Sequence, residues 1–191
     1  MDSSVFKFGQ DAHPSMWFIV ADELREAAKV LYDNRKRSIT AQKSNEGEIL
    51  LQKYTISRGY FLLTGFALEN LIKANLIGDN PDLIKEGKLD KSIGSHNIIR
   101  LCEMIKDFEL KVPEHDLLEL LKEAIPYWGR YPIPKNHTQI NDEKYLIESD
   151  HHTFLSLFER LQLRLLKRTS SNWLDVNGNK TDWDTHNYDR T

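Results

Sequence analysis

Arg130 and His137 are the two residues of this sequence whose types and spacing point most directly to chemistry. They stand seven positions apart, in a segment where Pro132 and Pro134 favour an extended backbone over a helix. Histidine supplies a base with a pKa near neutrality, and arginine supplies a fixed cation that binds phosphate through two parallel hydrogen bonds. These two groups can cleave RNA through its own 2′-hydroxyl without a metal ion. Such a spacing also arises by chance, so binding without cleavage and a structural role stay open as alternatives.

A second group of polar residues interrupts the most apolar stretch of the chain, at about residues 50–77. Apolar residues cover nearly every face of a helix here, which predicts a buried central helix. Glu69 precedes Lys73 by four residues, the order that favours an ion pair. The pair is either a modest surface pair or part of a site lined by the Glu69 carboxylate. In a structural role, Arg130 would anchor its loop to a carboxylate such as Glu69.

The elements that must position these residues all have helical periodicity. A first helix is predicted from Pro14 to about Asn34, and residues 35–47 lack periodicity, which indicates a loop. Gly59 and Gly65 weaken the central helix, so at least one of them is expected where a neighbouring backbone approaches closely. The inward stripe predicted for the first helix comprises Trp17, Val20, Ala21, Leu24, Ala27, Ala28 and Leu31.

Three more elements follow the central helix. Ser95 is predicted to cap a helix over residues 96–108, and Pro113 opens another, which Pro126 ends or kinks. A last helix begins at Ser149 or Asp150 and reaches about residue 168. No run alternates apolar and polar residues for long enough to indicate a strand. We therefore expect an all-α protein, an antiparallel bundle of four to five helices.

Length and composition fit a single globular domain. The chain has 191 residues, of which 40% are hydrophobic and 29% charged. We expect one domain over residues 1–168 and a polar, poorly packed, flexible tail over residues 169–191, with an Asn-Gly turn at Asn177. The single cysteine, Cys102, indicates a core thiol in a reducing compartment. No signal peptide or membrane span is apparent, which predicts a soluble, cytoplasmic protein without membrane contact.

Charge sets limits on partners. The net charge of −3 gives no global field that attracts nucleic acid, so any RNA or DNA binding must be local. Basic clusters at residues 35–37 and at Arg164, Lys167 and Arg168 are expected to be solvated helix ends. His151 and His152 point about 100° apart on a helix, and no paired spacing defines a zinc site. We therefore expect neither a metal nor another cofactor.

Three segments together resemble the HEPN superfamily of helical-bundle domains. They are GFALENLIKANLI in the central helix, S-H-N-I at the start of the next helix and W-G-R-Y-P-I-P-K-N-H around Arg130, and the likeness covers about residues 17–168. Members often carry an arginine, four to six residues and a histidine, and many are metal-independent ribonucleases or nucleotide-binding modules that act as dimers. The resemblance implies that Arg130 and His137 form this motif. Tyr131 and the two prolines depart from the pattern of active members.

The function expected on these grounds is RNA- or nucleotide-directed. The chain would be a homodimer and an endoribonuclease candidate of a defence or toxin–antitoxin type system, with Arg130 and His137 catalytic. Candidate substrate-binding residues are Glu69, Lys73, Tyr131 and Asn136. The alternative is a non-catalytic interaction module, antitoxin-like or regulatory, whose helices bind a protein partner. The proposed dimer contact involves Tyr127, Trp128, Tyr131 and Ile133.

Overall fold

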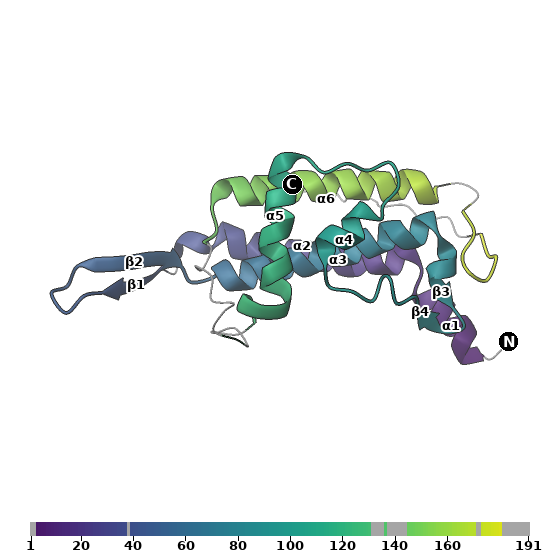
Figure 1. Ribbon diagram of the computed structural model, residues 1–191, viewed down its shortest axis with the longest axis horizontal. Helices are drawn as coiled ribbons and strands as arrows, with labels where there is room; N and C mark the ends of the chain where they lie inside the picture. Colours follow the sequence, from purple (N-terminus) through teal and green to yellow (C-terminus); the bar gives the residue numbers. More distant parts are fainter. Residues whose placement is uncertain (1–2, 38, 131–135, 137–144, 171–172, 181–191) are drawn as a thin grey trace.

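The computed structural model describes residues 3–37, 39–130, 136, 145–170 and 173–180. Over these residues it is an elongated helical body from one end of which a two-stranded ribbon projects (Figure 1). Six α-helices and two small antiparallel two-stranded sheets make up the described part of the chain. The predicted helical class is confirmed.

Three long helices form the body: α2 (Pro14–Asp33), α3 (Ser57–Asp79) and α6 (Glu148–Thr169). They lie alongside one another, while α5 (Val112–Glu123) runs across them (Figure 1). The arrangement therefore differs from the expected simple antiparallel bundle. The crossing helix continues into a π-helical turn, Ala124–Trp128, around Pro126, which confirms the predicted break.

Helix α2 begins at Pro14, as predicted, because proline suits the first turn and the His13 side chain accepts a hydrogen bond from the Ser15 amide. Its buried side comprises Pro14, Phe18, Ala21, Ala28 and Tyr32. Val20 and Ala27 are exposed, so their predicted inward position is wrong. They lie at the edge of the stripe, where the helical period turns them away from α3 and α6.

The connection between α2 and α3 is a β-ribbon, not a loop followed by an early helix start. Strand β1 (Ile39–Lys43) pairs antiparallel with β2 (Ile49–Tyr54), after a 3₁₀ turn at Arg35–Arg37. The predicted absence of strands and the predicted loop over residues 35–47 are both wrong. All five residues of β1 are exposed, so no buried face imposes the alternation that marks a strand in a sequence.

Helix α3 is the buried centre of the molecule, as the sequence predicts, although it begins at Ser57 rather than near residue 50. Tyr60, Phe61, Leu68, Leu71 and Ile72 are almost fully buried. A Cβ at Gly65 would meet a side-chain atom of Ile125 at 2.8 Å. The expected close approach therefore occurs at Gly65, but a side chain rather than a backbone makes it.

Several short elements complete the body. The segment after α3 forms a 3₁₀ turn, Pro81–Leu83, and a hairpin of β3 (Ile84–Lys85) and β4 (Lys88–Leu89). Helix α4 covers only Ile98–Glu103, and Asn97, not Ser95, is its N-cap. The N-terminal helix α1 (Ser3–Asp11) was not predicted.

The described part of the tail packs against the body. The indole nitrogen of Trp173 donates to the Gly78 carbonyl at 2.9 Å, and Asp175 is buried. The predicted Asn-Gly turn is present, with Gly178 at φ 77° and the Asn177 amide bonded to the Asp175 carboxylate. For these residues the expectation of poor packing is wrong, because the indole satisfies a carbonyl near the C-terminal end of α3.

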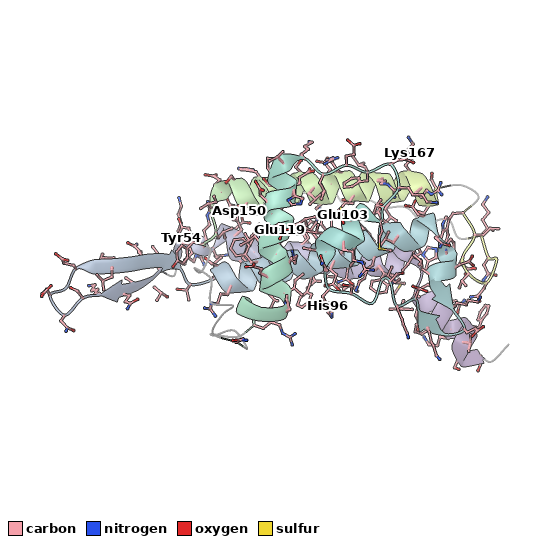
Figure 2. All side chains as sticks on the ribbon, viewed as in Figure 1. Tyr54, His96, Glu103, Glu119, Asp150 and Lys167 are labelled. Carbon is pink, nitrogen blue, oxygen red and sulfur yellow. The ribbon has the colours of Figure 1, made fainter. Side chains whose placement is uncertain are left out.

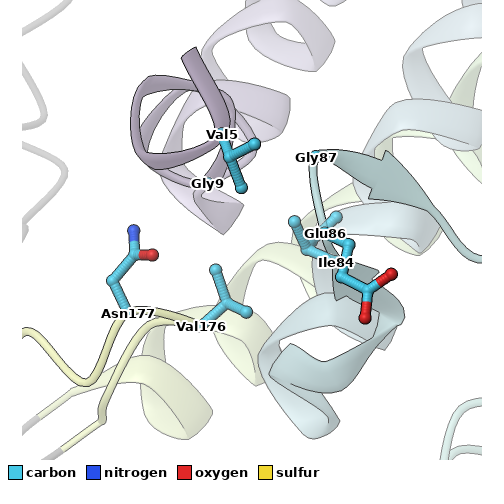
Figure 3. Close-up of a pocket in the computed structure, with 7 residues that line it drawn as sticks. All are labelled: Val5, Gly9, Ile84, Glu86, Gly87, Val176 and Asn177. Carbon is cyan, nitrogen blue, oxygen red and sulfur yellow. The ribbon is translucent and has the colours of Figure 1, made fainter. Parts of the chain in front are cut away.

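A shallow hollow of about 290 Å³ lies where α1, the β3–β4 hairpin and this turn meet (Figure 3). Its walls are largely apolar, and Glu86 and Asn177 supply polar groups. The side-chain nitrogen of Asn177, Nδ2, is buried without a described hydrogen-bond partner, whereas its backbone N–H is bonded to Asp175. The lining residues are Val5, Gly9, Ile84, Glu86, Gly87, Val176 and Asn177.

Candidate functional site

Arg130 is the last described residue before the segment that carries the predicted motif. Its side chain is exposed, directly after the π-helical turn. A Cβ at Gly129 would lie 3.4 Å from the Leu62 Cβ, so this end of the turn rests on the first half of α3. His137 and Tyr131 lie outside the described residues, whereas Asn136 is described and exposed. The predicted pairing of Arg130 with His137 therefore stays a prediction.

Glu69 forms the centre of a charged cluster on α3. The Lys73 ammonium donates to Glu69 Oε1 at 2.7 Å, and His96 Nδ1 lies 3.0 Å from Oε1 and 3.1 Å from Oε2. The Glu69 and Lys73 side chains are each only 7% exposed. The predicted ion pair therefore exists, but the interpretation as a surface pair is wrong. The lysine ammonium also lies 5.9 Å from the centroid of the Trp17 ring.

His96 approaches the cluster from the turn before α4. The Ser95 hydroxyl accepts a hydrogen bond from the Asn97 amide at 3.0 Å, and Asn97 Oδ1 accepts one from the Arg100 amide. These two bonds fix the turn and set the direction of the imidazole. The His96 side chain is 64% exposed, and Figure 2 places it at the surface of the body. An exposed imidazole is thus held by a buried carboxylate.

The carboxylate determines the protonation pattern of this imidazole. An ionised carboxylate only accepts hydrogen bonds, so Nδ1 of His96 must carry the proton that it donates to Glu69. In the neutral ring, Nε2 then has the lone pair and can act as a base. Lys73 balances the charge of Glu69 when the ring is neutral. The arrangement can perform general acid–base chemistry.

Sequence reasoning identified Glu69 and Lys73 but missed His96. In the sequence, His96 stands out only as part of the S-H-N-I segment that carries the family resemblance. The available signal was a histidine between two turn-forming residues at a helix start. Which carboxylate this histidine meets depends on how residues 80–97 fold back onto α3, and a sequence spacing of 27 residues does not reveal that.

A second histidine, His151, is part of a buried ring stack. Its Nδ1 is 2.8 Å from the Tyr60 hydroxyl, and its ring stacks on Tyr32 with centroids 3.5 Å apart. The Arg35 guanidinium lies 3.7 Å from the centroid of the Tyr32 ring. Burial lowers the pKa of His151, and burial raises the pKa of Tyr60. The stack joins α2, α3 and α6, and it is a structural joint.

At the basic end of α6, Arg164 forms a largely buried ion pair with Asp79 of α3, and we call this pair the strut. Arg164 donates to both carboxylate oxygens of Asp79, at 3.0 and 2.8 Å, and to Asn75 Oδ1 at 3.1 Å. Its side chain is only 17% exposed, so the expected solvated position is wrong for Arg164. Arg168 also pairs with Asp79. The strut borders a hollow of about 330 Å³ whose further lining residues include Lys106, Asp107 and Lys167 (the last labelled in Figure 2).

Cys102 is a core thiol, as predicted. Burial raises its pKa to about 12, and the nearby Glu114 carboxylate acts in the same direction. The reactive form of a cysteine is the thiolate, which this environment suppresses. Cys102 therefore contributes packing rather than chemistry.

No family model, curated protein sequence or solved structure matches the chain. Over the residues that the structure describes, no helix is long and apolar enough to cross a membrane. The same residues contain no group of three or more His, Cys, Asp or Glu side chains that could hold a metal ion.

Proposed function

We propose that this chain is an RNA-directed helical protein of HEPN type that cleaves single-stranded RNA without a metal ion. The observation that supports the proposal is the pair of Glu69 and His96, in which a buried carboxylate orients an exposed imidazole that can serve as an acid–base group in addition to His137. The exposed Arg130 adds a cation at the surface beside the same central helix. A base and a guanidinium are the two groups that this reaction needs.

The proposed reaction is an internal transesterification. An imidazole takes the proton of the 2′-hydroxyl, the 2′-oxygen attacks the adjacent phosphorus, and the 5′-oxygen leaves and is protonated. The products are a 2′,3′-cyclic phosphate and a 5′-hydroxyl end. Arg130 stabilises the additional negative charge on the pentacoordinate phosphorus. His137 is the proposed base.

The remaining candidate residues have supporting roles in this proposal. Tyr131 and Asn136 lie between Arg130 and His137 in the sequence and would contact substrate. Glu69 and Lys73 are buried against each other, which supports a positioning role through His96 rather than direct contact with RNA. His96 is either a second acid–base group or a structural hydrogen-bond donor, and the two roles predict different activities for its variants.

The test is an RNA cleavage assay in EDTA with wild type and single variants. We expect wild type to release 2′,3′-cyclic phosphate ends, and His137→Ala and Arg130→Ala to lower the rate by about 100-fold or more. His96→Ala lowers the rate only if His96 takes part in acid–base chemistry. Intact RNA with wild type under all conditions, or undiminished cleavage by both motif variants, would overturn the proposal.

A second candidate function, a protein-interaction module, is supported by α2. Its outer side exposes Met16, Ile19, Val20 and Val30, which are between 44% and 61% exposed. Apolar side chains clustered on an exposed helix face are typical of a protein contact. A protein that leaves RNA intact, but whose complex with a second chain is lost in Ile19→Lys, would favour this alternative.

A further inference from the structure

The ribbon between α2 and α3 carries a charge opposite to that of the rest of the protein. We call residues 35–54, which comprise the 3₁₀ turn and strands β1 and β2, the arm. The arm contains five lysines and arginines but only two acidic residues, a net charge of +3. Because the whole chain carries −3, the remaining residues carry −6. A positive segment on a negative body is the local field that polyanion binding requires.

The arm also projects away from the body (Figure 1). Every residue of β1 is exposed, and so are Ile49 and Leu50 of β2, at 58% and 60%. A two-stranded ribbon by itself is only marginally stable in water. Such a ribbon is suited to contact another molecule along its length.

The described cations extend along the arm. Lys36 and Arg37 are exposed at its base, and Lys43 is exposed at the outer end of β1. Five residues of strand span about 17 Å. That length matches about five phosphates of a stacked strand, at 3.4 Å each. Arg35, in contrast, donates to the Tyr32 carbonyl and stacks on its ring, so it fixes the base of the arm instead of facing a ligand.

We propose that the arm binds the phosphate backbone of single-stranded RNA. The choice of RNA rests on the proposed function, whereas the charge pattern by itself requires a polyanion. Tyr54 is the only aromatic residue of the arm and is partly buried, so the arm has no platform on which successive bases could stack. Binding is therefore independent of base sequence. A paired A-form helix fits less well, because its major groove is too narrow for a ribbon.

Two competing roles for the arm lead to different outcomes. Lysines on an exposed strand can simply prevent edge-to-edge pairing of sheets, in which case they bind nothing. The exposed Ile49 and Leu50 can instead form a contact between proteins. If the cations only protect the sheet edge, their replacement leaves RNA affinity unchanged. If the arm forms a protein contact, their replacement changes the association of protein chains instead.

The experiment measures binding of a fluorescent 20-nucleotide 2′-O-methyl RNA, which lacks the reactive hydroxyl, by anisotropy over a range of salt concentrations. The arm variant is Lys36→Gln/Arg37→Gln/Lys43→Gln. We expect it to lose about tenfold or more in affinity, and the slope of log K against log salt to become shallower by about 2, as three lost phosphate contacts imply. Circular dichroism checks that the variant remains folded.

The matched control is Lys85→Gln/Lys88→Gln/Lys91→Gln. These three lysines are also exposed, but they lie at the β3–β4 end of the body. The control changes the net charge by the same amount, so it separates a local site from a general effect of charge. We expect its affinity to stay within about twofold of wild type. The proposal would be overturned by an equal loss of RNA affinity in both variants or by no loss in the arm variant. It would also be overturned if the arm variant changed sedimentation but not RNA affinity.

Failure of the arm proposal can be distinguished from failure of the proposed ribonuclease. Binding that depends on the arm, without cleavage of unmodified RNA, supports the arm and contradicts the ribonuclease. Cleavage with an unchanged KM in the arm variant supports the ribonuclease and contradicts the arm. If both proposals are correct, the arm variant raises KM and leaves kcat at saturating RNA nearly unchanged, because it removes binding remote from the reacting groups.

Discussion

At the residue scale, Glu69 is the candidate site residue for which burial of a charged group matters most to stability. It is buried together with Lys73, and its carboxylate also accepts from His96. A neutral amide in its place would leave the lysine ammonium buried without a counter-charge. The cost of such an uncompensated charge is far larger than the worth of a surface pair.

We therefore expect Glu69→Gln to lower the free energy of unfolding by about 3–5 kcal/mol, measured by urea denaturation. The matched control is Glu119→Gln, which breaks an exposed pair with Lys122. It should cost less than about 1 kcal/mol. Similar, small losses in both variants would contradict the description of Glu69 and Lys73 as a buried pair.

His151 predicts a pH dependence of stability. Its pKa in the folded protein is lowered by burial, while in the unfolded chain it is near 6.5. The unfolded state therefore binds more protons below about pH 6.5, and folding stability falls as the pH decreases through and below that value. His13, whose pKa is also lowered by burial, acts in the same direction.

We expect the free energy of unfolding to be nearly constant between about pH 7 and 8 and to decrease as the pH falls from about 6.5 to 5. His151→Phe keeps an aromatic ring in the stack and should reduce this decrease, whereas His115→Ala, which removes an exposed imidazole on α5, should not. An unaltered pH profile in His151→Phe would show that this ring does not titrate in the folding reaction.

At the element scale, α3 is the helix around which the others pack. Leu71 is fully buried in it, with neighbouring elements on more than one side. Truncation of such a side chain leaves a cavity that the surroundings cannot fill completely. We expect Leu71→Ala to cost about 2–5 kcal/mol in chemical denaturation. Leu163→Ala on α6, where the side chain is 59% exposed, is the control and should cost about 0.5 kcal/mol or less.

At the scale of the whole molecule, we propose that two copies of the chain form a homodimer. Tyr131 and Ile133 lie outside the described residues, and the structure does not describe the side chains of Tyr127 and Trp128. The exposed apolar side of α2 is a second surface that a partner copy would cover. We expect a dimer in sedimentation at tens of micromolar, and dissociation on Val30→Lys if α2 forms the contact. A monomer at those concentrations would contradict the proposal.

The sequence by itself predicted the helical class, the start of α2 at Pro14, the buried centre of α3 and the break at Pro126. It placed the start of the last helix at Ser149 or Asp150, one or two residues after the observed start at Glu148. These features share a physical basis. In a helix packed against its neighbours, the apolar residues recur with the 3.6-residue period of the helix. Proline and glycine restrict or extend the allowed backbone angles in the same way whatever element lies beside them. The Glu69–Lys73 pair was predictable for the same reason, since residues four apart meet on any helix.

Only the tertiary structure decided the rest. All residues of β1 are exposed, as are Ile49 and Leu50 of β2, so burial imposes no apolar period on these residues, and the sequence assigned Leu50 to the central helix. The burial of the Glu69–Lys73 pair, the approach of His96 and the Arg164–Asp79 strut depend on contacts between segments far apart in the chain. Local propensity does not encode which distant side chains meet, because that is set by the packing of whole elements.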